Sequence, residues 1–161
     1  MEQKAVLIAM LTFQICKETH SNFEQIKPLG LEEKFEITVF NLYLALKKIR
    51  NNNPEIYERV LKTYLTQLGF IILSENLTAI DYSDLSDFLN NRFVSIATEI
   101  TNLQTGKETM PVMIYSQIFH SKLQIDVAPK MDLMDVLKFY SVMGKHMQYV
   151  ENEIESTLNR Y

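Results

Sequence analysis

The chain has 161 residues, 47% of them hydrophobic and 22% charged, and this share of apolar residues excludes an intrinsically disordered chain. Its formal net charge is −4, and the excess comes from residues 81–161, which carry eleven acidic and seven basic side chains. An acidic balance argues against duplex DNA and anionic membranes as partners, because binding to phosphate groups needs a basic face.

The first predicted helix spans residues 3–20. Its apolar start, AVLIAMLTF, resembles the core of a signal peptide, but no A-x-A-like cleavage site follows and the run is too short to cross a bilayer. We therefore expect a buried first helix in a cytoplasmic protein. Cys16 is the only cysteine, so no intramolecular disulfide can form, and we interpret it as a small buried hydrophobe. Helical spacing predicts one buried stripe, made of Leu7, Ile8, Leu11, Ile15, Cys16 and Thr19.

The next two predicted helices, residues 31–50 and 54–73, form the apolar centre of the sequence. The first is apolar nearly all round, which is typical of a central helix that is contacted from several sides. Asn53 and Pro54 mark the joint, because asparagine is a good N-cap and proline is tolerated at the first helical position. We expect these two helices to pack against each other.

Three further helices are predicted over residues 83–104, 110–125 and 131–159. All four prolines of the chain fall between or at the edges of predicted helices, which supports the segmentation independently of the hydrophobic pattern. The chain also has only four glycines, so helix breakers are few. The sequence thus predicts an all-α fold in which residues 1–161 form one domain, a bundle of about six helices (approximately 3–20, 31–50, 54–73, 83–104, 110–125 and 131–159).

The three histidines, His20, His120 and His146, do not belong to a metal-binding motif. No Glu precedes a His by three residues, so the E-x-x-H pairs of di-iron bundles are absent, as are cysteine pairs for zinc. His120 and His146 would meet if the helices over 110–125 and 131–159 were antiparallel neighbours, which leaves a metal or haem site as an alternative to ordinary histidines. We predict no metal, no cofactor and no catalytic residue.

The one basic cluster of the sequence closes the predicted helix over 31–50 and consists of Lys47, Lys48 and Arg50, beside three asparagines. Basic residues at this end complement the helix dipole, so a solvated helix end explains them. No aromatic interleaving marks a platform for single-stranded nucleic acid. We predict no nucleic-acid and no membrane partner.

Methionine concentrates toward the C-terminus, where six of the eight methionines fall between residues 110 and 147. Flexible, polarizable methionine side chains suit adaptable contact surfaces, and they also fill irregular cores. A glycine on the helix over 131–159 would let another helix approach closely. We therefore predict an interaction surface on this helix, made of Tyr140, Met143, Gly144 and Met147.

Two hypotheses of function remain open. The first is a non-enzymatic helical protein that acts through protein–protein contact, as an adaptor, small regulator, assembly factor or inhibitor. It rests on the absence of a polar catalytic cluster and of a cofactor motif. The second is a small-molecule-binding bundle or enzyme whose apolar pocket is lined by aromatic and methionine side chains. Because symmetric pairs are the commonest oligomers, we also expect a homodimer, formed through the long last helix.

Overall fold

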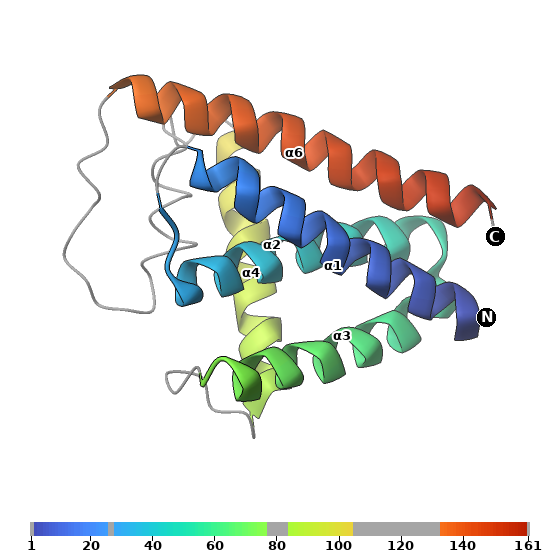
Figure 1. Ribbon diagram of the computed structural model, residues 1–161. Coiled ribbons are helices and arrows are strands. Elements are labelled where there is room, and N and C mark those ends of the chain that lie inside the picture. Colours follow the sequence, from blue (N-terminus) through green and yellow to red (C-terminus); the bar gives the residue numbers. More distant parts are fainter. Residues whose placement is uncertain (1, 26–27, 77–83, 105–132, 161) are drawn as a thin grey trace.

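Five helices make up most of the part of the chain that the computed structural model describes, residues 2–25, 28–76, 84–104 and 133–160 (Figure 1). They are α1 (Glu2–Glu24), α2 (Leu31–Asn52), α3 (Pro54–Ser74), α4 (Leu85–Gln104) and α6 (Leu133–Arg160). The predicted all-α fold is confirmed. The sixth predicted helix, residues 110–125, lies outside the described residues, and the single-domain organisation stays a prediction.

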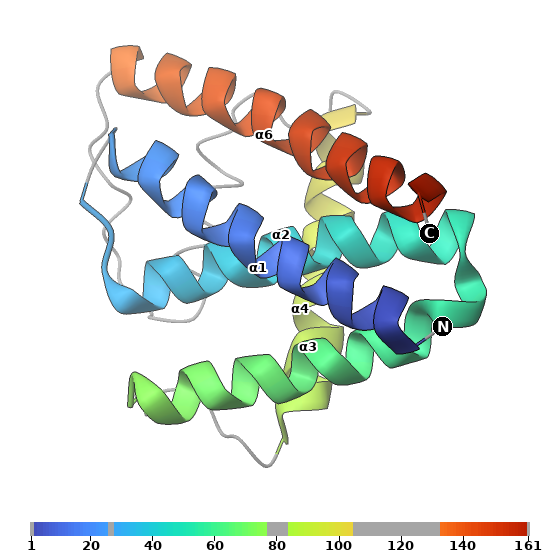
Figure 2. The same cartoon turned by 45° about the vertical axis from the view of Figure 1, so that its right-hand side comes forward.

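α2 occupies the centre of this arrangement. It contacts α1, α3, α4 and α6. α1 and α6 run side by side in opposite directions, and α4 crosses behind the other helices at a steep angle in both views (Figure 1, Figure 2). The predictions of a central second helix and of its packing against the third are therefore confirmed.

The core is built mainly from α2, in which every side chain from Phe35 to Leu42 is buried. This stretch includes three polar residues, Glu36, Thr38 and Asn41. A helix buried on all sides has no solvated face, so its polar side chains need partners inside the protein. The other helices supply apolar side chains around it, among them Ile8, Ile15, Val60, Tyr64, Leu68, Leu89, Val150 and Ile154.

α1 buries most of the stripe that the sequence pattern predicts, since Ile8, Ile15, Cys16 and Thr19 are all buried. Leu7, expected on the buried stripe, is 40% exposed, and Leu11 is half-buried. Small side chains at Ala5, Ala9 and Thr12 face inward instead and let neighbouring helices approach closely. The predicted burial of this stripe is therefore confirmed except at Leu7, which faces outward. The buried stripe consists of Ala5, Ile8, Ala9, Thr12, Ile15, Cys16, Thr19 and Phe23.

The joint between α2 and α3 is made by the backbone more than by the predicted side-chain cap. Pro54 begins α3, as predicted, but the Asn53 side chain makes no capping hydrogen bond. Its Nδ2 donates to the Glu55 carboxylate at 3.2 Å, and its backbone N–H donates to the carbonyl of Ile49 at 2.8 Å. The hydrogen bonding of α2 therefore continues up to the residue that precedes α3.

The start of α1 lies beside the end of α6. Lys4 Nζ donates to the carbonyl oxygen of Leu158 at 2.9 Å, although the two residues are 154 positions apart. Figure 1 shows both chain ends on the same side of the molecule. The bond also satisfies one of the carbonyl groups that the last turn of a helix leaves without an intrahelical donor.

Candidate functional site

Three large apolar side chains lie exposed on the outer face of α1. Val6, Leu7 and Met10 are 43%, 40% and 65% exposed. Met10 follows the other two by four and three residues, which makes the three neighbours on the helix surface. Single exposed apolar residues are common in proteins, whereas a contiguous exposed patch marks a binding surface. We call these three residues the α1 patch.

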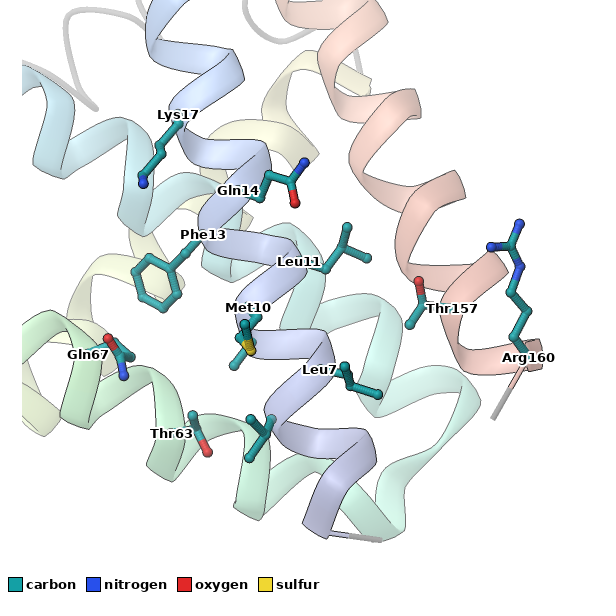
Figure 3. Close-up of a pocket in the computed structure, with 12 residues that line it drawn as sticks. Leu7, Met10, Leu11, Phe13, Gln14, Lys17, Thr63, Gln67, Thr157 and Arg160 are labelled. Atoms are coloured by element: carbon teal, nitrogen blue, oxygen red, sulfur yellow. The ribbon is translucent and has the colours of Figure 1, made fainter.

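The α1 patch lies in an open groove with a volume of about 680 Å³ (Figure 3). The groove runs along both sides of α1, between α3 and α6. Its lining includes Phe13, Thr63 and Gln67 toward α3, and Leu11, Thr157 and Arg160 toward α6. An apolar centre within a polar rim is the usual anatomy of a protein–protein contact surface.

The rim of the groove is basic. Lys17 and Arg160 line it, and an adjoining hollow of about 510 Å³, which shares residues with it, adds Arg59 and Lys62. All four are exposed, and none has an ion-pair partner in the described ranges. Glu2, in the lining of the second hollow, is the one acid among the residues that line either of the two. The chain as a whole has a net charge of −4, so this basic rim is a local exception.

A second candidate is a polar cluster buried between α1, α2 and α6, with Asn41 at its centre. The Asn41 Oδ1 atom contacts His146 Nε2. The Asn41 Nδ2 atom donates to Thr19 Oγ1 at 3.2 Å and to Cys16 Sγ at 3.4 Å. The Thr19 hydroxyl in turn donates to the carbonyl of Ile15 at 2.7 Å. The cluster therefore ties three helices together through partnered polar groups.

The chemistry of this cluster does not suit catalysis at neutral pH. Burial lowers the pKa of His146 to about 4, so the ring is neutral and its Nε2–H donates to Asn41. Burial also raises the pKa of Cys16 to about 12, so its sulfur stays a thiol and is a poor nucleophile. The interpretation of Cys16 as a small buried side chain is confirmed.

Two more buried polar contacts join helix pairs. Arg92 Nε on α4 donates to the carboxylate of Glu36 on α2 at 2.8 Å, and both side chains are 7% exposed. Thr12 Oγ1 on α1 lies 2.6 Å from the hydroxyl of Tyr64 on α3, and the Tyr64 ring meets Phe13 edge to face. These contacts fix α4 on α2 and α3 on α1, and the second of them holds the α3 wall of the groove against α1.

The predicted interaction surface falls mostly outside the part of the chain whose side chains are described. Tyr140, Met143 and Gly144 belong to α6, but their side chains are not among those described. Met147 is half-buried and packs against the core. The surface on α6 therefore stays a prediction, with Met147 partly engaged in packing. His120 also lies outside the described residues, so its predicted approach to His146 stays a prediction too.

In the ranges that the structure describes, no three His, Cys, Asp or Glu side chains gather in a group that could hold a metal ion. No helix there is long and apolar enough to cross a bilayer.

Comparison with protein-family models, with curated proteins and with solved structures found no match to this chain. Any assignment of function therefore rests on the geometry and charge of the molecule itself. At the α1 patch, exposed apolar side chains in a groove and a basic rim both indicate a binding surface.

Sequence reasoning misses the α1 patch because the run AVLIAML is apolar on every side of the helix. Hydrophobicity alone does not say which side is buried. The usable signal is side-chain size: Ala5, Ala9 and Thr12 share one side, where α1 can come closest to its neighbours. Val6, Leu7 and Met10 then face outward, and Ile8 is the large side chain of this run that is buried.

Proposed function

We propose that the protein acts by binding another protein, which lays an apolar surface with acidic edges on the α1 patch. The observation that carries this proposal is the 40–65% exposure of Val6, Leu7 and Met10 within one groove. Covering apolar surface contributes about 25 cal/mol for each Å² removed from water. A partner that fills the groove would gain this contribution along both sides of α1.

The basic rim favours a different protein over a second copy of this chain at this surface. In a two-fold symmetric pair the same patch occurs on both subunits, so the basic rim would face a basic rim. A partner whose apolar residues are flanked by Asp or Glu would complement Lys17, Lys62 and Arg160 instead. A homodimer, as expected from the sequence, would then use another surface.

The test begins with a photo-crosslinking amino acid in place of Met10 in the native cell. We expect it to capture one discrete protein, which is then purified and titrated into the chain by calorimetry. The double variant Leu7→Glu/Met10→Glu should raise the Kd by more than about tenfold, because it puts two charges into the apolar centre of the contact.

The matched control is the double variant Phe70→Glu/Leu73→Glu on α3. These side chains are 62% and 66% exposed and line neither hollow, so the same change of charge there should leave the Kd unaltered. Circular dichroism checks that both variants fold. An equal loss of affinity in both variants would contradict the proposal, as would equal crosslinking from positions 10 and 73 or no captured protein.

A further inference from the structure

A separate hollow lies where α2, α3 and α4 meet, with a volume of about 650 Å³. It shares no lining residue with the groove over α1. Its described lining contains aromatic rings, two cations and two amides, and no acidic residue. We call it the α2–α4 groove.

The cations of the α2–α4 groove belong to the basic cluster at the end of α2. The three members of this cluster point to different surroundings. Lys48 forms an ion pair with Glu155 at 2.8 Å. Lys47 and Arg50 line the groove, are exposed, and have no carboxylate partner in the described chain. The Arg50 guanidinium lies over the Tyr57 ring, 5.9 Å from its centroid, and this cation–π contact holds it at the groove.

The aromatic rings come from three different helices. Tyr43 on α2 and Phe93 on α4 lie with their ring centroids 5.7 Å apart, and Tyr57 on α3 completes the set. All three are half-buried. The hydroxyls of Tyr43 and Tyr57 have no hydrogen-bond partner in the described chain, and burial raises the pKa of Tyr43, so its phenol stays a donor. The three rings are far apart in the sequence, so the sequence pattern does not predict that they lie at one groove.

We propose that the α2–α4 groove binds a small molecule of mononucleotide size that carries an aromatic ring and a phosphate. The ring packs against Tyr43 and Phe93, and the phosphate pairs with Lys47 and Arg50, whose guanidinium suits a two-oxygen contact. The groove volume of about 650 Å³ falls within the range of about 300–1,000 Å³ that small-molecule sites occupy.

Two amides add hydrogen-bonding capacity to the same groove. Asn51 on α2 and Asn90 on α4 are exposed at its lining. Each amide offers both a donor and an acceptor, which is what the edge of a nucleobase or a ribose presents in return. The rings, the cations and the amides together match the three parts of a nucleotide.

The surroundings of the groove favour a small ligand over a nucleic-acid strand. Asp87 precedes Asn90 by three residues on α4, and Glu58 directly follows Tyr57 on α3; both acids are exposed. A strand of nucleic acid needs a basic groove that follows its backbone over several phosphates. Here Lys47 and Arg50 can serve the phosphate end of one nucleotide, and the neighbouring acids repel a longer chain.

The experiment titrates AMP, GMP, CMP and UMP into isotope-labelled protein and follows the backbone amide signals by NMR. We expect at least one nucleotide to give saturable shifts at residues of the α2–α4 groove. The matching nucleoside and inorganic phosphate, each titrated alone, should bind more than about tenfold more weakly, because each supplies only part of the contact.

The double variant Lys47→Gln/Arg50→Gln should weaken nucleotide binding by about tenfold or more. The control is Lys48→Gln, which removes one positive charge from the same turn of α2 but outside the groove, and this variant should bind like the wild type. Leu7→Glu/Met10→Glu should also leave nucleotide binding unchanged, because the two grooves share no residue.

Three outcomes would overturn the proposal. One is the absence of shifts at the groove with every nucleotide at millimolar concentration. Another is binding of phosphate alone as tightly as the nucleotide, which would leave the rings without a role. The third is binding of an oligothymidylate strand more than about tenfold more tightly than any mononucleotide, which would make the surface a polymer site.

Discussion

The interior of the bundle buries polar side chains, whereas the outer face of α1 exposes apolar ones. In the interior, polar groups are buried and held by partners from other helices, as Glu36 is by Arg92 and Asn41 is by His146. On the outer face, Val6, Leu7 and Met10 are apolar and exposed. Burying a polar group costs free energy unless another group forms a hydrogen bond or ion pair with it. An exposed apolar side chain does not gain the favourable free energy of burial. Substitutions in the two regions should therefore separate stability from binding.

The largest expected effect comes from the buried ion pair. Arg92→Met removes the guanidinium and leaves the Glu36 carboxylate buried without it, which should lower the free energy of unfolding by about 3 kcal/mol or more. Urea denaturation followed by circular dichroism measures this loss. The double variant Glu36→Leu/Arg92→Met removes both charges and should recover most of it. A single variant that costs less than about 1 kcal/mol would show that the pair is not buried in solution.

A smaller effect is expected from lowering the pH, because burial lowers the pKa of His146 from an ordinary value of 6.5 to about 4. Between these two values the unfolded chain binds a proton that the folded chain does not. The contribution of His146 to stability is therefore complete above pH 6.5 and is lost as the pH falls toward 4. Between pH 7 and pH 5 the loss should be about 2 kcal/mol.

The variant His146→Gln isolates this contribution, because burial lowers the pKa of His20 as well and acts in the same direction. Urea denaturation of both proteins at the two pH values gives the difference in their pH dependence. If the wild type and the variant lose the same free energy between pH 7 and pH 5, His146 does not titrate as its burial predicts.

The smallest effects should come from the outer face of α1. Leu7→Gln and Met10→Gln, made one at a time, should each change the free energy of unfolding by no more than about 0.5 kcal/mol, because both side chains are already exposed. The same variants should weaken binding to the partner. A loss of more than about 2 kcal/mol in either variant would place that side chain in the core and remove the α1 patch from consideration.

The positions of the helices could be predicted from the sequence because local signals determine them. Pro54 marks the start of α3, and the nearly continuous apolar content of α2 predicts its central place. These signals act within one or two turns of the chain. Asn53 is the N-cap residue of α3 as predicted, but its side chain bonds to Glu55 and not to the backbone.

The contacts that define the candidate sites could not be predicted in the same way. Asn41 and His146 are 105 positions apart, and nothing in either local sequence identifies the other. The rings of the α2–α4 groove likewise come from three helices. The outward face of α1 depends on which neighbours α1 packs against, so the apolar pattern near Leu7 fits two orientations. Tertiary packing, which the sequence pattern does not encode locally, decides between them.

The bond between Lys4 and Leu158 has a consequence for the choice of bait in a binding experiment. It brings the start of α1 beside the end of α6, and Val6 and Arg160 both line the groove over α1. An affinity tag fused to either of these helix ends would emerge next to the α1 patch and compete with a partner for it. Untagged protein, or protein freed from its tag by proteolysis, is therefore the appropriate bait.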